Sequence, residues 1–244
     1  MNCKDGVLRF LESARGEYVS GERLAGALGV TRQAVSKAVR SLTQEGYEIS
    51  SFPRKGYLLA EKCDLVSPAV IAAETGVRTL FFETLPSTNG VAAAEYLKGG
   101  ECLVVARRQS AGRSKDGKGF PSPEDGGIYL SAAFPLDLAA EESDFFREEC
   151  ASAVERVIEE ASGKRARRVR LDEFYFGEKK TAGILTEFMI RGDTKRTEFA
   201  VVGIGIYTGA AFSREIEPVP SKESRNRMIV SLWRELQEVR KKFE

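Results

Sequence analysis

The sequence predicts an α+β protein with two domains, an N-terminal winged helix-turn-helix and a larger mixed α/β domain. Three short helical patterns followed by two strand-like runs predict the first domain. Strand-like and helix-like runs alternate over the rest of the 244 residues and predict the second. We place the boundary near residue 65, which gives domains of residues 1–64 and 65–244.

Three helices are expected in the first 46 residues. The first covers residues 6–14. Ser20 is expected to cap the second, which Gly29 ends, and Thr31 to cap a third over residues 31–46. The short turn between the second and third helices is typical of a helix-turn-helix. The core-facing side chains expected on the second helix are Leu24, Ala27 and Leu28.

A β-hairpin follows, and its tip carries two positive charges. The strand-like runs 47–52 and 55–60 are joined by Pro53-Arg54-Lys55-Gly56, so the hairpin is a candidate wing. Between residues 32 and 55 there are five basic and two acidic residues, a local charge of +3. A cationic, polar helix exposed by a short turn fits the major groove of DNA. The residues expected to contact DNA are Thr31, Arg32, Gln33, Ser36, Lys37, Arg40, Arg54 and Lys55. The alternative is a winged fold that contacts another protein.

Composition excludes several classes of site. Lys and Arg total 37 against 36 Asp and Glu, a net charge of +1, so any nucleic-acid surface must be a local patch. Histidine is absent, which excludes His-dependent nucleophiles and His metal sites. The four cysteines are too widely separated for a zinc or redox motif. Because no apolar stretch approaches the ~20 residues of a membrane span, we expect a cytoplasmic protein without metal or membrane.

The second domain begins with a helix opened by Pro68, followed by a strand over residues 80–85. The other expected strands cover residues 102–108, 127–134, 181–190 and 197–207, and the expected helices residues 89–100, 141–162 and 222–244. A loop over residues 109–120 contains three glycines and the cations Arg113, Lys115 and Lys118. Such a loop can wrap a phosphate or carboxylate, although by itself it is more often a surface loop.

Several motifs resemble those of biotin protein ligases. QSAGRSKDGKGFPSPEDGGIYLS, residues 109–131, resembles the biotin-binding loop QTAGRGRxGRxWxSPxGGxLYxS. Ser87-Thr88-Asn89 stands where the family has a Ser-Thr-Asn ligand motif, and GEKKTAGILTE, residues 177–187, resembles GxKxAGILxE. Residues 28–59 are similar to the winged helix of the bifunctional biotin ligase/biotin operon repressor.

The resemblance implies a biotin/lipoyl-ligase-like second domain. The family joins biotin to AMP from ATP and then to a lysine of a carrier protein, and the adenylate-bound form dimerises on its operator. The ligand-binding residues that the resemblance implies are Ser87, Thr88, Asn89, Gln109, Gly112, Arg113, Ser114, Lys115, Gly183, Gly203 and Gly205.

Departures from the family pattern argue against adenylation. The family's Lys-Trp-Pro-Asn-Asp block aligns with residues 169–173, where Val169 replaces a lysine that stabilises developing negative charge. Asp116 stands among the cations of the glycine loop, and Tyr207 replaces an asparagine. The family usually continues into a small β-barrel domain, whereas this sequence stops at Glu244. We therefore expect no catalytic residue and no use of ATP or AMP.

The leading hypothesis is a homodimeric transcriptional regulator that binds operator DNA and senses biotin or a related small acid without ligating it. The first alternative is an active biotin protein ligase and operon repressor, in which Lys115, Arg168 or Arg170 substitutes for the missing lysine. A second keeps the pocket for another cofactor acid, such as lipoate. In a third, the retained polar residues only close loops.

Overall fold

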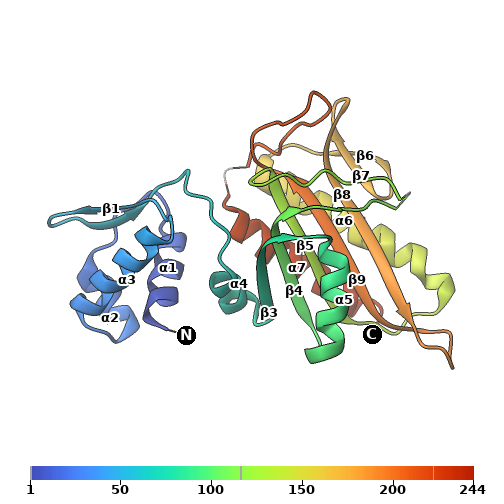
Figure 1. Cartoon of the computed structure of the whole chain (residues 1–244), viewed down its shortest axis with the longest axis horizontal. Coiled ribbons are helices and arrows are strands. Elements are labelled where there is room, and N and C mark those ends of the chain that lie inside the picture. Colours follow the sequence, from blue (N-terminus) through green and yellow to red (C-terminus); the bar gives the residue numbers. More distant parts are fainter. Residues whose placement is uncertain (1, 116, 222) are drawn as a thin grey trace. The chain divides into compact units, whose positions relative to one another are not determined.

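The computed structural model describes residues 2–115, 117–221 and 223–244. It separates into two compact units, residues 1–73 and 74–244 (Figure 1). The domain boundary near residue 65 stays a prediction. Asp116 and Lys222 lie outside the described residues. None of the described helices combines the length and the apolar character needed to cross a membrane.

The first unit is a winged helix-turn-helix. Its elements are α1 (Cys3–Ser13), α2 (Gly21–Leu28), α3 (Arg32–Gln44), β1 (Ile49–Phe52) and β2 (Gly56–Leu59), with β1 and β2 antiparallel. The expected caps are confirmed: Ser20 accepts from the N–H of Arg23, and Thr31 accepts from the N–H of Ala34. Gly29 ends α2 with a left-handed φ of 64°.

The core of the first unit differs from the expectation at one position. Ala27 is exposed, and Ala25 is buried in its place beside Leu24. The helix α2 has only eight residues, so it presents a narrow buried stripe.

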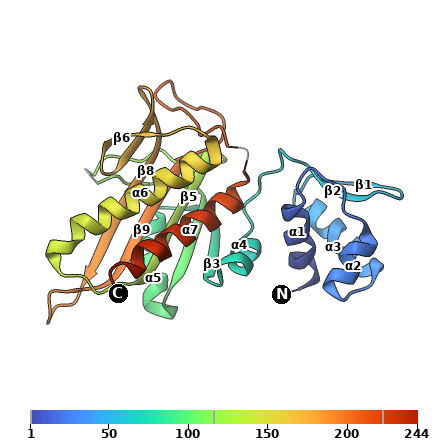
Figure 2. The same cartoon turned by 180° about the vertical axis from the view of Figure 1, so that it is seen from behind.

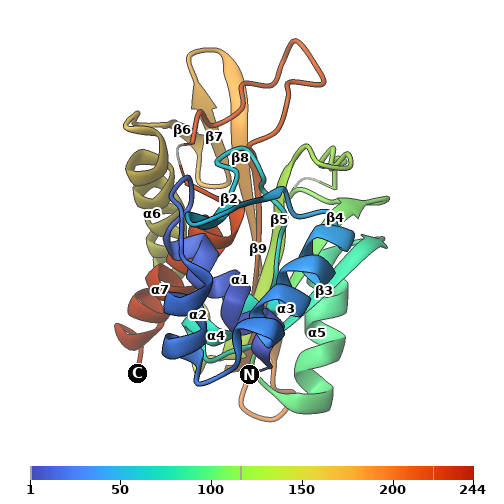
Figure 3. The same cartoon turned by 90° about the vertical axis from the view of Figure 1, so that its left-hand side faces the viewer.

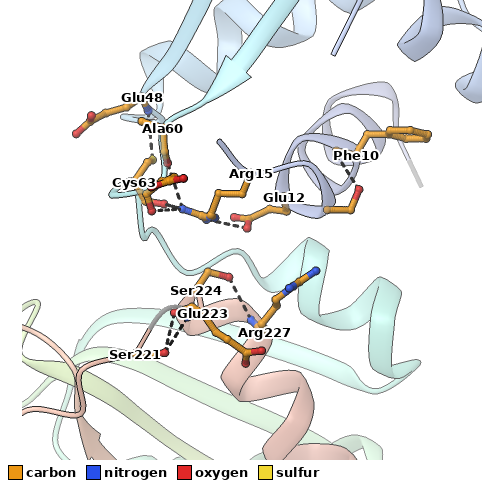
Figure 4. Close-up of polar contacts among 12 residues, drawn as sticks. Phe10, Glu12, Arg15, Glu48, Ala60, Cys63, Ser221, Glu223, Ser224 and Arg227 are labelled. Carbon is orange, nitrogen blue, oxygen red and sulfur yellow. Dashed lines mark hydrogen bonds and ion pairs between the residues drawn. The ribbon is translucent and has the colours of Figure 1, made fainter. Parts of the chain in front are cut away.

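A half-buried arginine, Arg15, links the end of the wing to α1. Arg15 Nη1 donates to the carbonyls of Ala60, Glu61 and Cys63, while its Nη2 donates to Glu12 Oε2 at 2.7 Å (Figure 4). Glu12 is only 8% exposed, so this ion pair gives a largely buried carboxylate a cationic partner.

The second unit is a seven-stranded sheet with helices on both faces (Figures 2 and 3). The strand order is β3-β4-β5-β9-β8-β7-β6. The strands are β3 (Arg78–Leu85), β4 (Cys102–Gln109), β5 (Gly127–Pro135), β6 (Arg167–Arg170), β7 (Glu173–Phe176), β8 (Lys179–Ile190) and β9 (Thr197–Tyr207). Only β3 and β4 pair in parallel, and α5 (Thr88–Gly99) connects them. The remaining helices of this unit are α6 (Ser143–Ser162), α7 (Arg225–Lys241) and the short η1 (Ala140–Glu142), whereas α4 (Pro68–Thr75) lies mostly in the first unit and ends just past the division between the two.

The helices cover opposite faces of this sheet. Figure 3 shows α5 on one face and the pair α6 and α7 on the other. The last helix begins at Arg225, three residues after the expected start, because Ser224 accepts a hydrogen bond from the N–H of Arg227 and caps it (Figure 4). The mixed α/β architecture is as predicted, except for the hairpin of β6 and β7, which was not expected.

Candidate functional site

A polar network joins the start of α5 to the end of β4 and the middle of β5. Gln109 Oε1 accepts from the N–H of Thr88 at 2.8 Å, and Gln109 Nε2 donates to Ser122 Oγ at 2.9 Å. Ser131 Oγ lies 2.7 Å from Thr88 Oγ1 and donates to Asn89 Oδ1 at 2.6 Å. The network is therefore preorganised, with neutral donors and acceptors and no formal charge.

Asn89 extends this network to β8. Its Nδ2 donates to the carbonyl of Leu185 at 3.2 Å and to Glu187 Oε2 at 2.7 Å. The other oxygen of Glu187 lies 3.4 Å from Arg113 Nη2. Glu187 thus connects the glycine loop to the helix that carries the Ser-Thr-Asn motif.

Glycines form the floor of the site, and their lack of a side chain is required. Gly183 and Gly205 pair across β8 and β9. A Cβ at Gly183 would lie 2.9 Å from the ring of Phe120, and one at Gly205 would overlap the same ring. A Cβ at Gly203 would overlap Asn89 Oδ1. The floor therefore lets Phe120 and Asn89 approach the backbone closely.

Phe120 packs between this floor and Tyr207. The two rings are stacked, with centroids 5.3 Å apart and planes 4° apart, and the Tyr207 hydroxyl donates to the carbonyl of Pro121 at 3.1 Å. Burial raises the pKa of Tyr207, so its hydroxyl keeps its proton. The tyrosine that replaces the family's asparagine therefore fills space behind Phe120.

These groups surround a cavity of about 30 Å³. At about 10–15 Å³ per water, such a space holds two or three water molecules. The predicted ligand-binding residues that line it are Ser87, Thr88, Asn89, Gln109, Arg113, Ser114, Gly183, Gly203 and Gly205. Gly112 is buried behind the cavity, against Ser122. Lys115 instead lines a neighbouring cavity of about 70 Å³, opposite Arg147.

Sequence reasoning missed one cation in the first cavity, Lys180. Its Nζ lies 2.6 Å from Glu173 Oε1 and 5.4 Å from the centroid of the Phe120 ring. If side chains alternated regularly between the two faces of β8, Thr181 and not Lys180 would lie on the same face as Gly183. A β-bulge changes the register here and brings Lys180 to the cavity. The side chains missed with it are Phe120, Asp172, Ile184, Leu185 and Ile204.

Electrostatic pairing compensates the cations near the cavity. The hydrogen bond from Lys180 lowers the pKa of Glu173, which therefore stays ionised. Arg168 lies 2.6 Å from Glu148 and 3.4 Å from Glu155, and it does not line the first cavity. Arg168 and Arg170, two of the candidates to replace the missing lysine, do not line this cavity, whereas Lys180, which was not a candidate, does.

The predicted DNA-contacting residues lie on α3 and the wing. Ser36 is half-buried, and the remaining seven are exposed. The two acidic residues of this segment are occupied, since Glu45 pairs with Lys4 at 2.7 Å and Glu48 with Lys62 at 3.4 Å. Within the described residues none of the five cations forms an ion pair with an acidic side chain, although Lys55 lies 5.4 Å from the centroid of the Tyr18 ring. The five cations are Arg32, Lys37, Arg40, Arg54 and Lys55. The surface therefore carries uncompensated positive charge.

No cluster of three or more potential His, Cys, Asp or Glu metal ligands occurs within the described ranges.

Comparison with known proteins links both units to characterised relatives. A family model described as "HTH domain" matches residues 6–58. Bifunctional ligase/repressor BirA of Bacillus subtilis (strain 168) is 31% identical over 207 residues, which cover 82% of this chain and 63% of that protein. The protein of the same name from Escherichia coli (strain K12) is 29% identical over 196 residues, covering 79% of this chain and 60% of that one. The chain thus spans less than two thirds of the length of these relatives.

Solved structures share the fold of the second unit. The biotin protein ligase of Leishmania major, in complex with biotinyl-5-AMP, gives a TM-score of 0.55 at 21% identity, over 68% of this chain and 75% of that one. The biotin protein ligase of Aquifex aeolicus, in complex with biotin and ATP, gives a TM-score of 0.51 at 24% identity, and the match covers 68% of this chain and 71% of that one. At these identities the likeness establishes the fold alone.

Proposed function

Because this chain belongs to the BirA family of bifunctional ligase/repressors, we propose that it is a DNA-binding transcriptional regulator that senses biotin or a related small carboxylic acid. The chain combines a helix-turn-helix domain with a biotin-ligase-like fold, as that family does. Operator DNA, a small-molecule effector and a second copy of the chain are its proposed partners.

The main support for this proposal is that the lining of the first cavity combines neutral polar groups with a cation. One end offers the neutral donors and acceptors of Thr88, Asn89 and Gln109, and Lys180 supplies an ammonium group at the lining. Phe120 and the glycine floor lie among these groups. Such a lining suits a small acid with a neutral polar head, an apolar middle and one carboxylate.

The residues that line the first cavity do not fit ATP. Both cations that line the cavity already face carboxylates, Arg113 at 3.4 Å from Glu187 and Lys180 at 2.6 Å from Glu173. A triphosphate brings several negative charges, and these carboxylates would repel it. We therefore propose ligand binding without adenylation, and the departures at Val169 and Tyr207 support the same conclusion.

Ligand binding would change the affinity for DNA because the ligand site and the dimer are coupled through the glycine loop. Arg113 ties the glycine loop to Glu187, and a ligand beside Asn89 would change that tie. A loop that differs between the free and bound states can bias a homodimer, and a two-fold dimer would bind two half-sites.

Fluorescence anisotropy with duplex DNA, selected from a random pool by the wild-type protein, tests this proposal. Biotin should change the affinity of the wild-type protein, and Arg113→Ala should keep basal DNA binding while losing that response. Equal DNA affinity with and without biotin and lipoate would refute the sensor.

A second candidate function is an active biotin protein ligase, and the position of Lys180 favours it. An ammonium group beside a bound carboxylate can stabilise negative charge that develops there. Incubation with ATP, biotin and a biotin carrier domain, followed by a streptavidin blot, decides between the two. A labelled carrier that disappears with Lys180→Ala would establish the ligase.

A further inference from the structure

An exposed aromatic pair lies beside the tip of the wing. Phe52, the last residue of β1, is 50% exposed, and Tyr18, which precedes α2, is 39% exposed. Their rings meet edge to face, with centroids 5.5 Å apart. Two exposed rings held against each other form a contiguous aromatic surface that a partner can contact.

The backbone holds this pair rigidly. Val19, next to Tyr18, forms a β-bridge with Tyr57, with N–H to O distances of 2.8 and 2.9 Å. In the hairpin Phe52 lies opposite Gly56, which has no side chain to cover the ring. Gly56 has a φ of +106°, and a Cβ there would overlap the Val19 carbonyl. The ring of Phe52 therefore rests on Tyr18 and remains open to solvent.

Two cations of the hairpin tip lie beside the pair, Arg54 and Lys55. The Lys55 ammonium lies 5.4 Å from the centroid of the Tyr18 ring. Arg54, beside it, has a φ of +65°, a left-handed conformation that is strained for a residue other than glycine. Such strain is typically found where the local backbone serves a function. The strained tip presents two cations beside two exposed rings.

We propose that this wing tip is an aromatic and cationic wedge for the minor groove of duplex DNA. Arg54 and Lys55 contact phosphates, and Phe52, supported by Tyr18, packs against the sugars and base edges of the groove. Charge complementarity selects nucleic acid as the partner, and apolar side chains inserted into the minor groove are an established mode of contact. The inference rests on the proposed function as a DNA-binding protein.

The salt dependence of binding separates the aromatic contribution from the ionic one. We would measure the dissociation constant of full-length protein for the selected duplex at several salt concentrations. Phe52→Ala should weaken binding about tenfold with an unchanged salt slope, because an apolar contact releases no counterions. Lys55→Ala should reduce the slope by about 0.9. Leu97→Ala, which removes an isolated side chain that is 72% exposed on α5, is the matched control and should bind as wild type.

Hydroxyl-radical footprinting gives a second readout, because the radicals attack sugars that line the minor groove. The wild-type protein should protect sugars flanking the α3 contact, and Phe52→Ala should lose that protection while Phe52→Trp keeps it. Wild-type affinity and protection in Phe52→Ala would overturn the wedge alone. Failure of the wild-type protein to bind any duplex would instead refute the proposed function.

Discussion

Replacing Asn89 by alanine should disrupt the site because this side chain joins three elements. Asn89 is 3% exposed and accepts from Ser131 at 2.6 Å, and it donates to the Leu185 carbonyl and to Glu187. Two neutral hydrogen bonds contribute roughly 0.5–1.5 kcal/mol each, and one to a carboxylate roughly 1.5–3. Since Glu187 is partly exposed and the terms are not additive, we expect a loss of about 2–4 kcal/mol.

Tryptophan fluorescence measures this loss in the correct unit. Trp233 is the only tryptophan of the chain and lies on α7, so its emission reports unfolding of the second unit. The loss should lower the melting temperature by roughly 5–12 °C. Biotin affinity should fall at least tenfold, because Asn89 also lines the cavity.

Asn89→Asp is the matched control, since it keeps the size and adds a charge beside Glu187. Two adjacent carboxylates raise the pKa of the pair, so stability should be retained near pH 4 and lost as the pH rises towards 7. Less than 0.5 kcal/mol lost by Asn89→Ala, together with unchanged biotin affinity, would refute the reasoning.

Three further substitutions test separate features. The hydrogen bond from Lys180 holds the pKa of Glu173 below its usual value, so the ionised carboxylate stabilises the fold at neutral pH and this stabilisation is lost as the pH falls through the lowered pKa. Glu173→Gln should therefore make the stability measured in urea titrations less dependent on acidic pH, and it should free the lysine to bind biotin more tightly. Gly205→Ala should lower biotin affinity more than tenfold by calorimetry, because its methyl group displaces Phe120; wild-type affinity would contradict this. Lys37→Ala should weaken DNA binding by anisotropy and reduce the salt slope by about 0.9, and an unchanged slope would place α3 outside the groove.

Local sequence signals predicted most of the fold. Ser20, Thr31 and Gly29 marked the ends of helices through capping chemistry, which depends on nearest neighbours alone. The hairpin of β6 and β7 escaped notice because its arginine-rich first strand, residues 167–170, lies at the sheet edge, where hydrophobic alternation is weak.

The site was less accessible to sequence reasoning. The motifs at residues 87–89 and 109 pointed to one cavity lining, which tertiary structure assembles from α5 and β4. Lys180 could not be placed from alternation, because the bulge depends on pairing with β7. The compensation of Arg113 by Glu187 also depends on a contact distant in sequence.

Calorimetric titration of the purified protein with biotin, followed by a non-hydrolysable biotinyl-adenylate analogue, tests the central claim most directly. We predict saturable biotin binding that Lys180→Ala weakens at least tenfold, with no added affinity for the adenylate. Absence of heat with both compounds would contradict a biotin-sensing cavity, and much tighter binding of the adenylate analogue would contradict the loss of adenylation.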